Sequence, residues 1–418
     1  MKITPVKGTN DYLPAQAELR NYLQKKICET YEQAGFQRIA TPIIEDIENL
    51  DKSEGGDNLN LIFKVMKRGE KLKKAIASQN PDNIADMGLR YDLTLPLSRY
   101  YANNRASLPQ PFKVIQMDRV YRAERPQKGR LREFIQCDID ILGDPSNLAE
   151  IELILATTTT LGKLGFKNFQ IRINERRILK AMAAYSGFPE ESYDSVFIIL
   201  DKMDKIGLEG VKEELIKYEF SEESVNKYVS LFKEIEQQAN PIDYLAEKLG
   251  DYMEDDVKQW MNEIIESVKA TKSSDFEIVF DPTLVRGMSY YTGTIFEIAI
   301  PEFGGSCGGG GRYDKMVGKF IGHDVPACGF SIGFERIVLL LMEQGFKIPE
   351  EYNKVAYLIE KGVKEDALCD VIAQAQEERK NGTQVLVTRM NKNKKFQKEQ
   401  LKEQGYEEFK EFYKNPLK

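Results

Sequence analysis

Residues 120–140, VYRAERPQKGRLREFIQCDID, carry charged side chains at the alternate spacing that is typical of β-strands. Arg122 and Glu124 stand at the end of one predicted strand. Because side chains alternate along a strand, one face of the next predicted strand carries three polar residues, Gln136, Asp138 and Asp140. Such a hairpin aims an arginine at one end of a pocket and an amide and a carboxylate at the other. An exposed ribbon with ion pairs is the alternative.

Two further arginines have apolar surroundings. Arg286 interrupts an apolar strand pattern in LVRGMSYYTGTIFE, and Arg336 follows Glu335 at the start of an otherwise aliphatic helix. A buried guanidinium is costly unless it pairs with an anion, and its planar fork suits pairs of oxygen atoms. For Arg336 alone, a capped core helix is the simpler interpretation.

A glycine cluster, GGSCGGGGR, spans residues 304–312. A dinucleotide-binding fingerprint requires a helix directly after its glycines, whereas this cluster follows a predicted strand and continues into RYD. We therefore disfavour a dinucleotide site. Glycines that let the backbone approach a ligand closely are the alternative.

His323 is the only histidine of the chain, and the five cysteines form no C-x-x-C pair. Ser-His-Asp hydrolysis, paired-histidine metal sites and thiolate zinc sites therefore find no support. We predict that His323 lies in a loop. The groups that remain for catalysis or binding are arginine, carboxylates, glutamine, tyrosine and backbone amides. These groups suit charge stabilisation around phosphates.

The composition of the 418 residues is typical of a globular protein, with 42% hydrophobic and 30% charged residues. At roughly 150 residues per domain, two or three domains are expected. The net charge of −7 gives no general affinity for polyanions. No signal peptide and no apolar run near the roughly 20 residues of a membrane span is found. These features predict a soluble, cytoplasmic protein without membrane contact.

Hydrophobic periodicity predicts the elements that must position these residues. Helices are expected over residues 14–34, 96–103, 147–164, 333–344, 366–380 and 394–403. Strands are expected over residues 38–44 (broken by Pro42), 61–67, 87–94, 112–122, 133–142, 169–174, 276–280, 292–300, 355–359 and 384–387. Two of these strands, 112–122 and 133–142, flank a basic loop and predict an antiparallel hairpin.

The same patterns divide the chain into four segments. Residues 1–177 and 271–345 are expected to form two parts of one core. Residues 178–270, rich in lysine and glutamate with helical periodicity, are expected to form a helical insertion. Residues 354–418 alternate strands and helices and predict a small α/β domain.

The small C-terminal segment is basic, although the whole chain is acidic. It holds 14 lysines and arginines against 11 acidic residues, and residues 389–402 concentrate six cations against Glu399 alone. A solvated helix face is one interpretation. Phosphate contact with a nucleic acid is the other.

Together these segments resemble the class II aminoacyl-tRNA synthetases and, within them, the histidyl-tRNA synthetase family. The likeness covers essentially the whole chain and rests on KGTNDYLP at 7–14, motif 1 around Pro42, motif 2 at 120–140, LVRGMSYYTG at 284–293, GGGGRYD at 308–314 and the GFER of motif 3 at 333–336. LRYDLT at 89–94 is similar to a variant found in archaeal, eukaryotic and some bacterial members. The resemblance implies an α+β fold with a class II antiparallel sheet flanked by helices, a helical insertion and a small C-terminal α/β domain.

The resemblance implies a reaction in two steps. L-Histidine attacks the α-phosphate of ATP to give histidyl-adenylate, and the histidyl group then moves to tRNA(His). Arg122 and Arg286 are implied at the α-phosphate, Arg286 also at the substrate carboxylate, and Arg336 at the γ-phosphate. Mg²⁺ is implied on the phosphates, with Glu124 or Glu133 as conceivable contacts, and Glu124 is also implied in ATP binding.

The resemblance also implies a histidine pocket. The residues implied around the α-ammonium group are Asp92, Thr94 and Gln136. Those implied around the imidazole are Asp140, Tyr290 and Tyr291. Those implied as the pocket floor are Gly308, Gly309, Gly310 and Tyr313. A carboxylate and a phenol can satisfy both ring nitrogens, so an analogue without them leaves buried polar groups unpaired.

Further expectations concern partners. The loop at residues 125–132 is implied near the tRNA acceptor stem, and motif 1 is implied in a homodimer. Ser289 departs from the family, since many members have an acidic residue there. The C-terminal segment is shorter than the usual anticodon-binding domain, which leaves anticodon contact open.

A rival hypothesis comes from another class of protein. A non-catalytic, histidine-sensing regulatory subunit of ATP phosphoribosyltransferase has the same catalytic-domain fold and lacks tRNA-binding parts. The short C-terminal segment favours this alternative. The three arginines oppose it, because a subunit that only senses histidine has no need of phosphate-binding residues.

Overall fold

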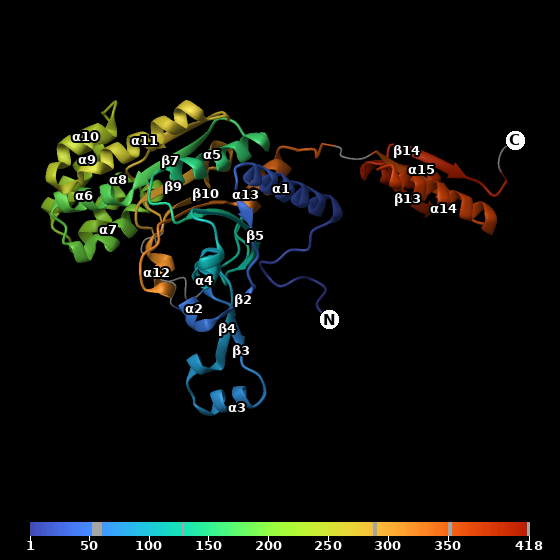
Figure 1. The fold of residues 1–418 in the computed structure, drawn as a ribbon, viewed down its shortest axis with the longest axis horizontal. Helices are drawn as coiled ribbons and strands as arrows, with labels where there is room; N and C mark the ends of the chain where they lie inside the picture. The colour runs from blue at the N-terminus through green and yellow to red at the C-terminus, as the bar shows by residue number, and fades with distance from the viewer. Residues whose placement is uncertain (52–60, 128, 287–290, 350–352, 416–418) are drawn as a thin grey trace. The chain divides into compact units, whose positions relative to one another are not determined.

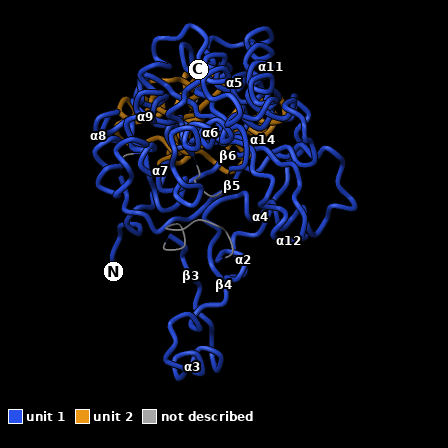
Figure 2. Tube along the Cα trace, turned by 90° about the vertical axis from the view of Figure 1, so that its left-hand side faces the viewer, with its two compact units in different colours: residues 1–12, 20–344 blue, residues 13–19, 345–418 orange. Residues whose placement is uncertain are grey.

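The computed structural model describes residues 1–51, 61–127, 129–286, 291–349 and 353–415. Their contacts form two compact units, which Figure 2 shows in different colours. The first unit comprises Met1–Tyr12 and Arg20–Gln344, and the second comprises Leu13–Leu19 and Gly345–Lys418. Residues 178–270 lie within the first unit.

An eight-stranded sheet forms the centre of the first unit (Figure 1). Its strand order is β1 (Gln37–Arg38), β5 (Phe112–Tyr121), β6 (Glu133–Leu142), β11 (Ala327–Ile332), β10 (Gly305–Arg312), β9 (Thr294–Ile300), β7 (Phe169–Glu175) and β8 (Phe276–Phe280). Neighbouring strands pair antiparallel, except β1 with β5 and β7 with β8. The predicted α+β class with a mainly antiparallel sheet is confirmed.

The strands β5 and β6 form the predicted hairpin, in register from Phe112 opposite Leu142 to Tyr121 opposite Glu133. On β6 the odd-numbered residues Cys137, Ile139 and Ile141 are apolar and buried. Helices α5 (Leu148–Lys163) and α13 (Phe334–Glu343) pack against this strand. The even-numbered residues of β6 point to the opposite face, because side chains alternate.

The glycine cluster forms an interior strand, β10, which the sequence did not predict as a strand because glycine has low strand propensity. It pairs with β9 on one side and with β11 on the other. A Cβ built on Gly310 would lie 1.9 Å from the carbonyl oxygen of Gly329. Glycine is required there because the neighbouring backbone leaves no room for a side chain.

The strand predicted at residues 38–44 is interrupted at Pro42, as expected. It is split into β1 and β2 (Ile44–Asp46), and the segment between them contains Pro42, which cannot donate a backbone hydrogen bond. The strand predicted at 87–94 ends earlier, as β4 (Ala85–Leu89). Arg90 follows it with no exposed surface and donates to the carbonyls of Thr41 and Arg119 at 2.8 and 2.9 Å.

A second, three-stranded sheet has the order β2, β4 and β3 (Lys64–Met66). Next to it in the chain lie the helices α2 (Ile47–Asp51) and α3 (Gly69–Ala77). The chain then enters α4 (Thr94–Asn104), which packs with α12 (Lys315–Ile321). Their residues Leu97, Tyr101, Met316 and Val317 share an apolar cluster with Phe112 and Val114 of β5.

Residues 176–271 are largely helical. The helices are α6 (Arg176–Ser186), α7 (Tyr193–Leu200), α8 (Met203–Lys217), α9 (Glu222–Ile235), α10 (Pro241–Leu249) and α11 (Asp255–Thr271). The first begins where the Glu175 side chain accepts from the Arg177 amide and ends at Gly187, whose φ of 90° suits glycine. The predicted helical character is confirmed.

The second unit has a three-stranded parallel sheet of order β13 (Gln384–Arg389), β12 (Lys354–Ile359) and β14 (Glu408–Phe412). Its helices are α14 (Glu365–Lys380) and α15 (Lys394–Glu403). His323, in the first unit, lies in an exposed turn after α12, as predicted. None of the helices in the described ranges is long and apolar enough to cross a membrane.

Candidate active site

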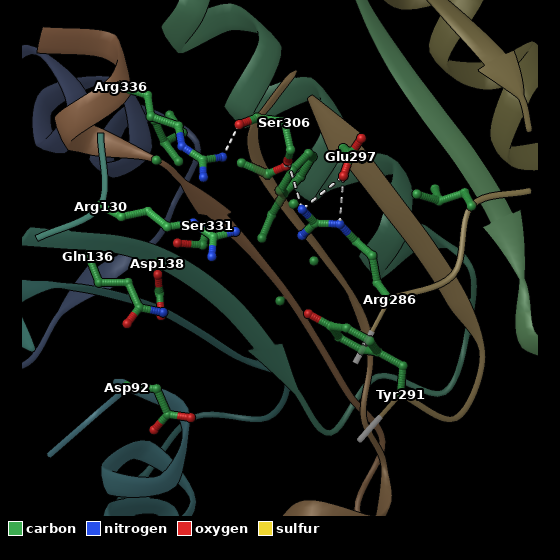
Figure 3. A pocket seen from close by; sticks show the side chains of 18 of the residues that line it. Asp92, Arg130, Gln136, Asp138, Arg286, Tyr291, Glu297, Ser306, Ser331 and Arg336 are labelled. Atoms are coloured by element: carbon green, nitrogen blue, oxygen red, sulfur yellow. Dashed lines mark hydrogen bonds and ion pairs between the residues drawn. The ribbon is translucent and has the colours of Figure 1, made fainter. Parts of the chain in front are cut away.

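A cavity of about 1200 Å³ lies over the face of the sheet that carries the even-numbered residues of β6. Its walls come from β6, β7, β9, β10 and β11, from the loop before α4, from the start of α13, and from α7 and the start of α8. In Figure 3, Asp92, Gln136 and Asp138 lie on one side of this cavity, and Arg286 and Tyr291 lie on the other. Polar groups from distant parts of the sequence therefore meet in one cavity.

The strand β6 supplies the row of polar side chains that the sequence predicted. Gln136, Asp138 and Asp140 all line the cavity. Opposite Asp140 stands Gly329 of β11, where a Cβ would lie 2.0 Å from the Asp140 carboxylate. A glycine at this position is what leaves room for the carboxylate.

Asp140 and Tyr313 form the most buried polar pair of the site. The Tyr313 hydroxyl donates to Asp140 Oδ1 at 2.5 Å. Burial raises the pKa of Asp140 to about 7, although the Tyr313 hydrogen bond acts against this. The other oxygen, Oδ2, has no hydrogen-bond partner among the described residues. Burial also raises the pKa of the Tyr291 hydroxyl.

Asp92 and Thr94 lie where the chain enters α4. The Leu95 amide donates to Asp92 Oδ1 at 3.2 Å, which fixes the carboxylate at the start of the helix. Burial raises the pKa of Asp92, and the Leu95 hydrogen bond and the Arg122 guanidinium lower it. Both side chains line the cavity.

Arg122 follows directly after β5 and also lines the cavity. Its Nε donates to the Tyr91 carbonyl at 2.9 Å, and its guanidinium stacks 5.1 Å from the centre of the Phe134 ring. These two contacts fix the plane of the guanidinium, so its fork has a defined direction.

Arg286 and Arg336 approach one another across Ser306 (Figure 3). Arg286 pairs with Glu297 at 2.9 Å and donates to the Ser306 hydroxyl at 2.7 Å. Arg336 donates to the Ser306 carbonyl. Burial lowers the pKa of Arg336, and the positive charges of Arg130 and Arg286 act in the same direction. This end of the cavity is therefore suited to an anion with several negative charges.

The carboxylate of Glu335, which precedes Arg336, is engaged in hydrogen bonds that connect elements of the fold. It accepts from both terminal nitrogens of Arg20 at 2.6 and 2.7 Å and from the Ile135 amide at 3.1 Å. These bonds tie α13 to α1 (Pro14–Gln33) and to β6. They hold Arg336 at the cavity, so the interpretation of this segment as no more than a capped core helix is incomplete.

The glycines of β10 form a backbone wall beside Arg286. A Cβ on Gly309 would lie 2.2 Å from Arg286 Nη1, and one on Gly308 would lie 2.4 Å from the Ser331 carbonyl oxygen. Both glycines line the cavity with Tyr313. The glycines therefore allow neighbouring protein atoms to approach the backbone of β10 closely, and close approach to a ligand stays a prediction.

The remaining predicted residues do not all belong to this arrangement. Tyr290 and Ser289 lie outside the described residues. Glu124 lines the cavity, 3.9 Å from Arg130, whereas Glu133 does not line it and pairs with Arg119 at 3.4 Å. Within the described ranges, no group of three His, Cys, Asp or Glu side chains could hold a metal ion.

Sequence reasoning left several cavity residues without a role. Among them are Asp138, Glu297, Ser306, Gly329 and Ser331. The period of two on β6 had already placed Asp138 on the correct face. The others come from strands and loops whose pairing with β6 and β10 is known only from the fold.

Comparison with known proteins gives consistent matches. A family model described as histidyl-tRNA synthetase matches residues 8–337. The histidine–tRNA ligase of Leifsonia xyli is 44% identical over 355 residues, which cover 81% of this chain and 80% of that protein. The histidine–tRNA ligase of Christiangramia forsetii is 39% identical over 350 residues, 81% of this chain and 76% of that protein.

Solved structures share the fold. The histidyl-tRNA synthetase of Nostoc sp. PCC 7120 matches with a TM-score of 0.79 and 26% identity, over 97% of this chain and 90% of that one. A Bacillus halodurans protein described as ATP phosphoribosyltransferase regulatory subunit/histidyl-tRNA synthetase matches with a TM-score of 0.77 over 99% of both chains. At 20% identity, this second likeness shows the fold alone.

Proposed function

The chain belongs to the histidyl-tRNA synthetase family, and we propose that its cavity is where histidine is activated. The protein is a histidine–tRNA ligase, which joins L-histidine to tRNA(His) using ATP. The histidine carboxylate attacks the α-phosphate of ATP and pyrophosphate leaves. A hydroxyl of the terminal adenosine of the tRNA then attacks the histidyl carbonyl of the adenylate, and AMP leaves. The regulatory-subunit alternative is less supported, because the curated relatives are ligases.

Three arginines in one cavity are the observation that carries this proposal. We propose that Arg122 and Arg286 bind the α-phosphate, that Arg286 also contacts the histidine carboxylate, and that Arg336 binds the γ-phosphate. The positions support these roles, because Arg286 and Arg336 lie at one end of the cavity while the carboxylates lie across from them. Such fixed cations stabilise the charge that develops on the phosphate without a proton transfer.

The opposite wall is proposed to bind the amino acid. The imidazole would lie against Asp140, Tyr313 and Tyr291. The unpartnered Oδ2 of Asp140 supports this role, because a ring N–H would give it a donor. The α-ammonium would lie near Asp92, Thr94 and Gln136. An amino acid without two ring nitrogens would leave these buried groups unpaired and would be rejected.

The family uses ATP, and we propose that Mg²⁺ accompanies it. The described residues offer no cage of three metal ligands, which fits Mg²⁺ better than a metal held by protein alone, because Mg²⁺ binds through phosphates, waters and one or two carboxylates. Glu124, on the cavity wall, is the carboxylate proposed to face it. When bound, the ion would neutralise phosphate charge.

We propose that tRNA contacts the loop at residues 125–132 and the basic helix α15. In the loop, Arg130 lines the cavity. On and before α15, Lys392, Lys395 and Lys402 are exposed. Lys394 and Lys398 instead pair with Glu411. The positive charge that α15 has available for tRNA is therefore smaller than the sequence predicted.

We propose that the reaction takes place in the cytoplasm, with tRNA(His) as the partner.

A homodimer is proposed through the small sheet near motif 1. Ile44 and Met87 share one face of that sheet, because Ile44 pairs with Leu89 and Met87 pairs with Asp46. Ile43, Ile44 and Met87 are exposed by 38, 49 and 37%. Clustered apolar side chains of this kind mark an interaction surface, and a second copy is the proposed partner.

The decisive experiment is histidine-dependent exchange of labelled pyrophosphate into ATP, measured without tRNA beside a panel of other amino acids. Exchange with histidine alone is expected. Charging of tRNA(His) is then measured with the same enzyme. No exchange, together with tight histidine binding in calorimetry, would favour the regulatory subunit.

A further inference from the structure

Asp138 lies in the middle of the polar row on β6 and has no role in the reaction described so far. Its side chain is 4% exposed and lines the cavity. Its Oδ1 has no hydrogen-bond partner among the described residues. A buried carboxylate oxygen without a donor is costly, so its retention needs an explanation.

Its surroundings are mainly negative. Asp140 lies two positions along the same strand, and Asp92 approaches from the loop before α4. Arg122, after β5, is the cation that acts on it, and Ser331 of β11 stands directly opposite. Burial raises the pKa of Asp138 well above its usual range, and the negative charges of Asp140 and Asp92 raise it further. The hydrogen bond with Ser331 and the positive charge of Arg122 lower it.

Ser331 forms a hydrogen bond with the Asp138 carboxylate, and the neighbours leave its Oδ1 available for a ligand. Tyr313 is committed to Asp140, and the Leu95 amide is committed to Asp92. Arg122 has its Nε on the Tyr91 carbonyl and its face on Phe134. The carboxylates do not form a group that could hold a metal ion. The cation that suits this wall is therefore an organic one with several N–H donors.

We propose that Asp138 binds the α-ammonium group of the histidine substrate together with Asp92. This inference rests on the proposed function and adds a specificity-determining residue to it. In Figure 3 Asp138 lies beside Gln136, on the side of the cavity that holds Asp92. An ammonium group between the carboxylates supplies the missing donor and removes the repulsion between them. The positive charge of the free amino acid, and not only its ring, is thereby recognised.

The test uses Asp138→Asn, which keeps the shape of the side chain and removes its charge. Binding to the full chain is measured by calorimetry with histidine, with histidinol, which keeps the ammonium, and with β-imidazolelactate, which lacks it. Affinity for histidine and histidinol should fall by about tenfold to a hundredfold, the usual effect of losing a hydrogen bond to a charged group. Affinity for β-imidazolelactate should stay within about twofold.

Proton release gives a second readout that a merely structural residue would not change. Histidine binding at pH 7, measured in buffers of different ionisation enthalpy, should release protons from the wild-type protein, because the cation favours ionised carboxylates. The Asp138→Asn protein should release fewer protons. Its unliganded melting temperature should equal or exceed that of the wild type, since the cost of protonating or burying this carboxylate on folding is gone.

Two results would overturn the inference. One is an equal loss for all three ligands, and the other is unchanged histidine binding and proton release. If Asp138→Asn fails to fold, Asp138→Ser gives the same comparison. The proposed function is judged separately, by pyrophosphate exchange of the wild-type protein, so a failure of either can be recognised.

Discussion

Arginine, and not lysine, stands at each position proposed to bind a phosphate. A guanidinium keeps its charge at any physiological pH and presents a planar fork to two oxygens. Glu297 and Ser306 hold Arg286 in place, and Tyr91 and Phe134 hold Arg122. Because these donors are fixed before substrate arrives, little reorganisation is needed in the reaction.

Replacing Arg286 should therefore affect the rate more than the fold. We expect Arg286→Ala to lower histidine-dependent pyrophosphate exchange by about a hundredfold or more, the usual effect of removing one preorganised donor. Arg286→Lys should recover only part of the rate, because lysine lacks the fork. The measurement is the exchange rate at saturating histidine and ATP.

Arg119→Ala is the matched control for this change. Arg119 is 59% exposed and pairs with Glu133 outside the cavity, so its loss should leave the rate unchanged. Full exchange activity of the Arg286→Ala protein, with an unchanged thermal transition, would contradict the proposed phosphate contact.

The carboxyl of Asp140 predicts a pH dependence of stability. Its pKa is about 7 in the folded protein and near 3.8 when the chain is unfolded. Between these values the folded state binds more protons, so the free energy of unfolding should fall as the pH rises through this window. Asp140→Asn cannot ionise and should gain in melting temperature relative to the wild type from pH 5 to pH 8. A difference that is constant with pH would refute this assignment.

Most of the predicted site residues that the structure describes line the cavity, but they are a minority of its lining. The arginines stood out because a cation in an apolar pattern needs a partner, and the β6 row followed from the period of two. The partners of Arg286 could not be predicted, because Glu297 and Ser306 lie on strands whose register depends on the whole sheet. The structural role of Glu335 could not be predicted either, because its partner Arg20 is more than 300 residues away in the chain.

Among the elements, β10 and α5 are joined by a buried ion pair. Arg312, at the end of β10, donates to both oxygens of Glu150 on α5 at 2.7 and 2.6 Å. Arg312 also donates to the carbonyls of Asp144 and Ser146 and stacks 5.4 Å from the Trp260 ring of α11. Its neighbour Tyr313 contacts Asp140, so this pair helps to position the proposed imidazole site.

Breaking the pair should be costly. Glu150→Ala leaves the Arg312 charge buried, and we expect the free energy of unfolding to fall by about 3–5 kcal/mol. Glu152→Ala on the same helix is the control, because Glu152 forms a partly exposed pair with Lys113 and should cost at most about 1 kcal/mol. Urea unfolding followed by circular dichroism measures both, and equal losses would contradict the distinction.

The elements themselves were predicted unevenly. β6, β8 and α15 have the predicted bounds, because their patterns are regular and their ends carry clear turn signals. The helices α3 and α12 and the strands β11 and β14 were not predicted. Each is short or glycine-containing, and each gains its stability from tertiary packing and not from local propensity.

At the scale of the whole molecule, the cavity belongs to the first unit and the basic helix α15 to the second. This division predicts that the two steps of the reaction can be separated. Replacing Lys392, Lys395 and Lys402 together by Glu should lower tRNA charging several-fold, because phosphate contacts are lost. Pyrophosphate exchange should be unchanged.

Lys361→Glu with Lys364→Glu is the control for this change, because both lysines are exposed in the second unit before α14. It should affect charging less. Equal losses from both sets would indicate a general effect of charge, and a loss of exchange would indicate damage to the first unit.

The proposed homodimer predicts a change in mass. Ile44→Asp puts a charge into the apolar surface of the small sheet and should convert dimers to monomers in light scattering at micromolar concentration. Ile216→Asp, at an exposed apolar position on α8, should leave the mass unchanged. A wild-type monomer at all concentrations would rule out the dimer.

The glycine strand β10 limits how this enzyme could be redesigned to charge tRNA with unnatural amino acids. One wall of the pocket is main chain, so its shape cannot be enlarged by trimming side chains, and any residue larger than glycine would meet backbone atoms at 1.9 to 2.7 Å at Gly308, Gly309 and Gly310. Libraries that vary this wall should yield almost only inactive proteins. Altered substrates should instead be reached through the side chains of β6 and through Tyr313, where the wall is made of exchangeable groups.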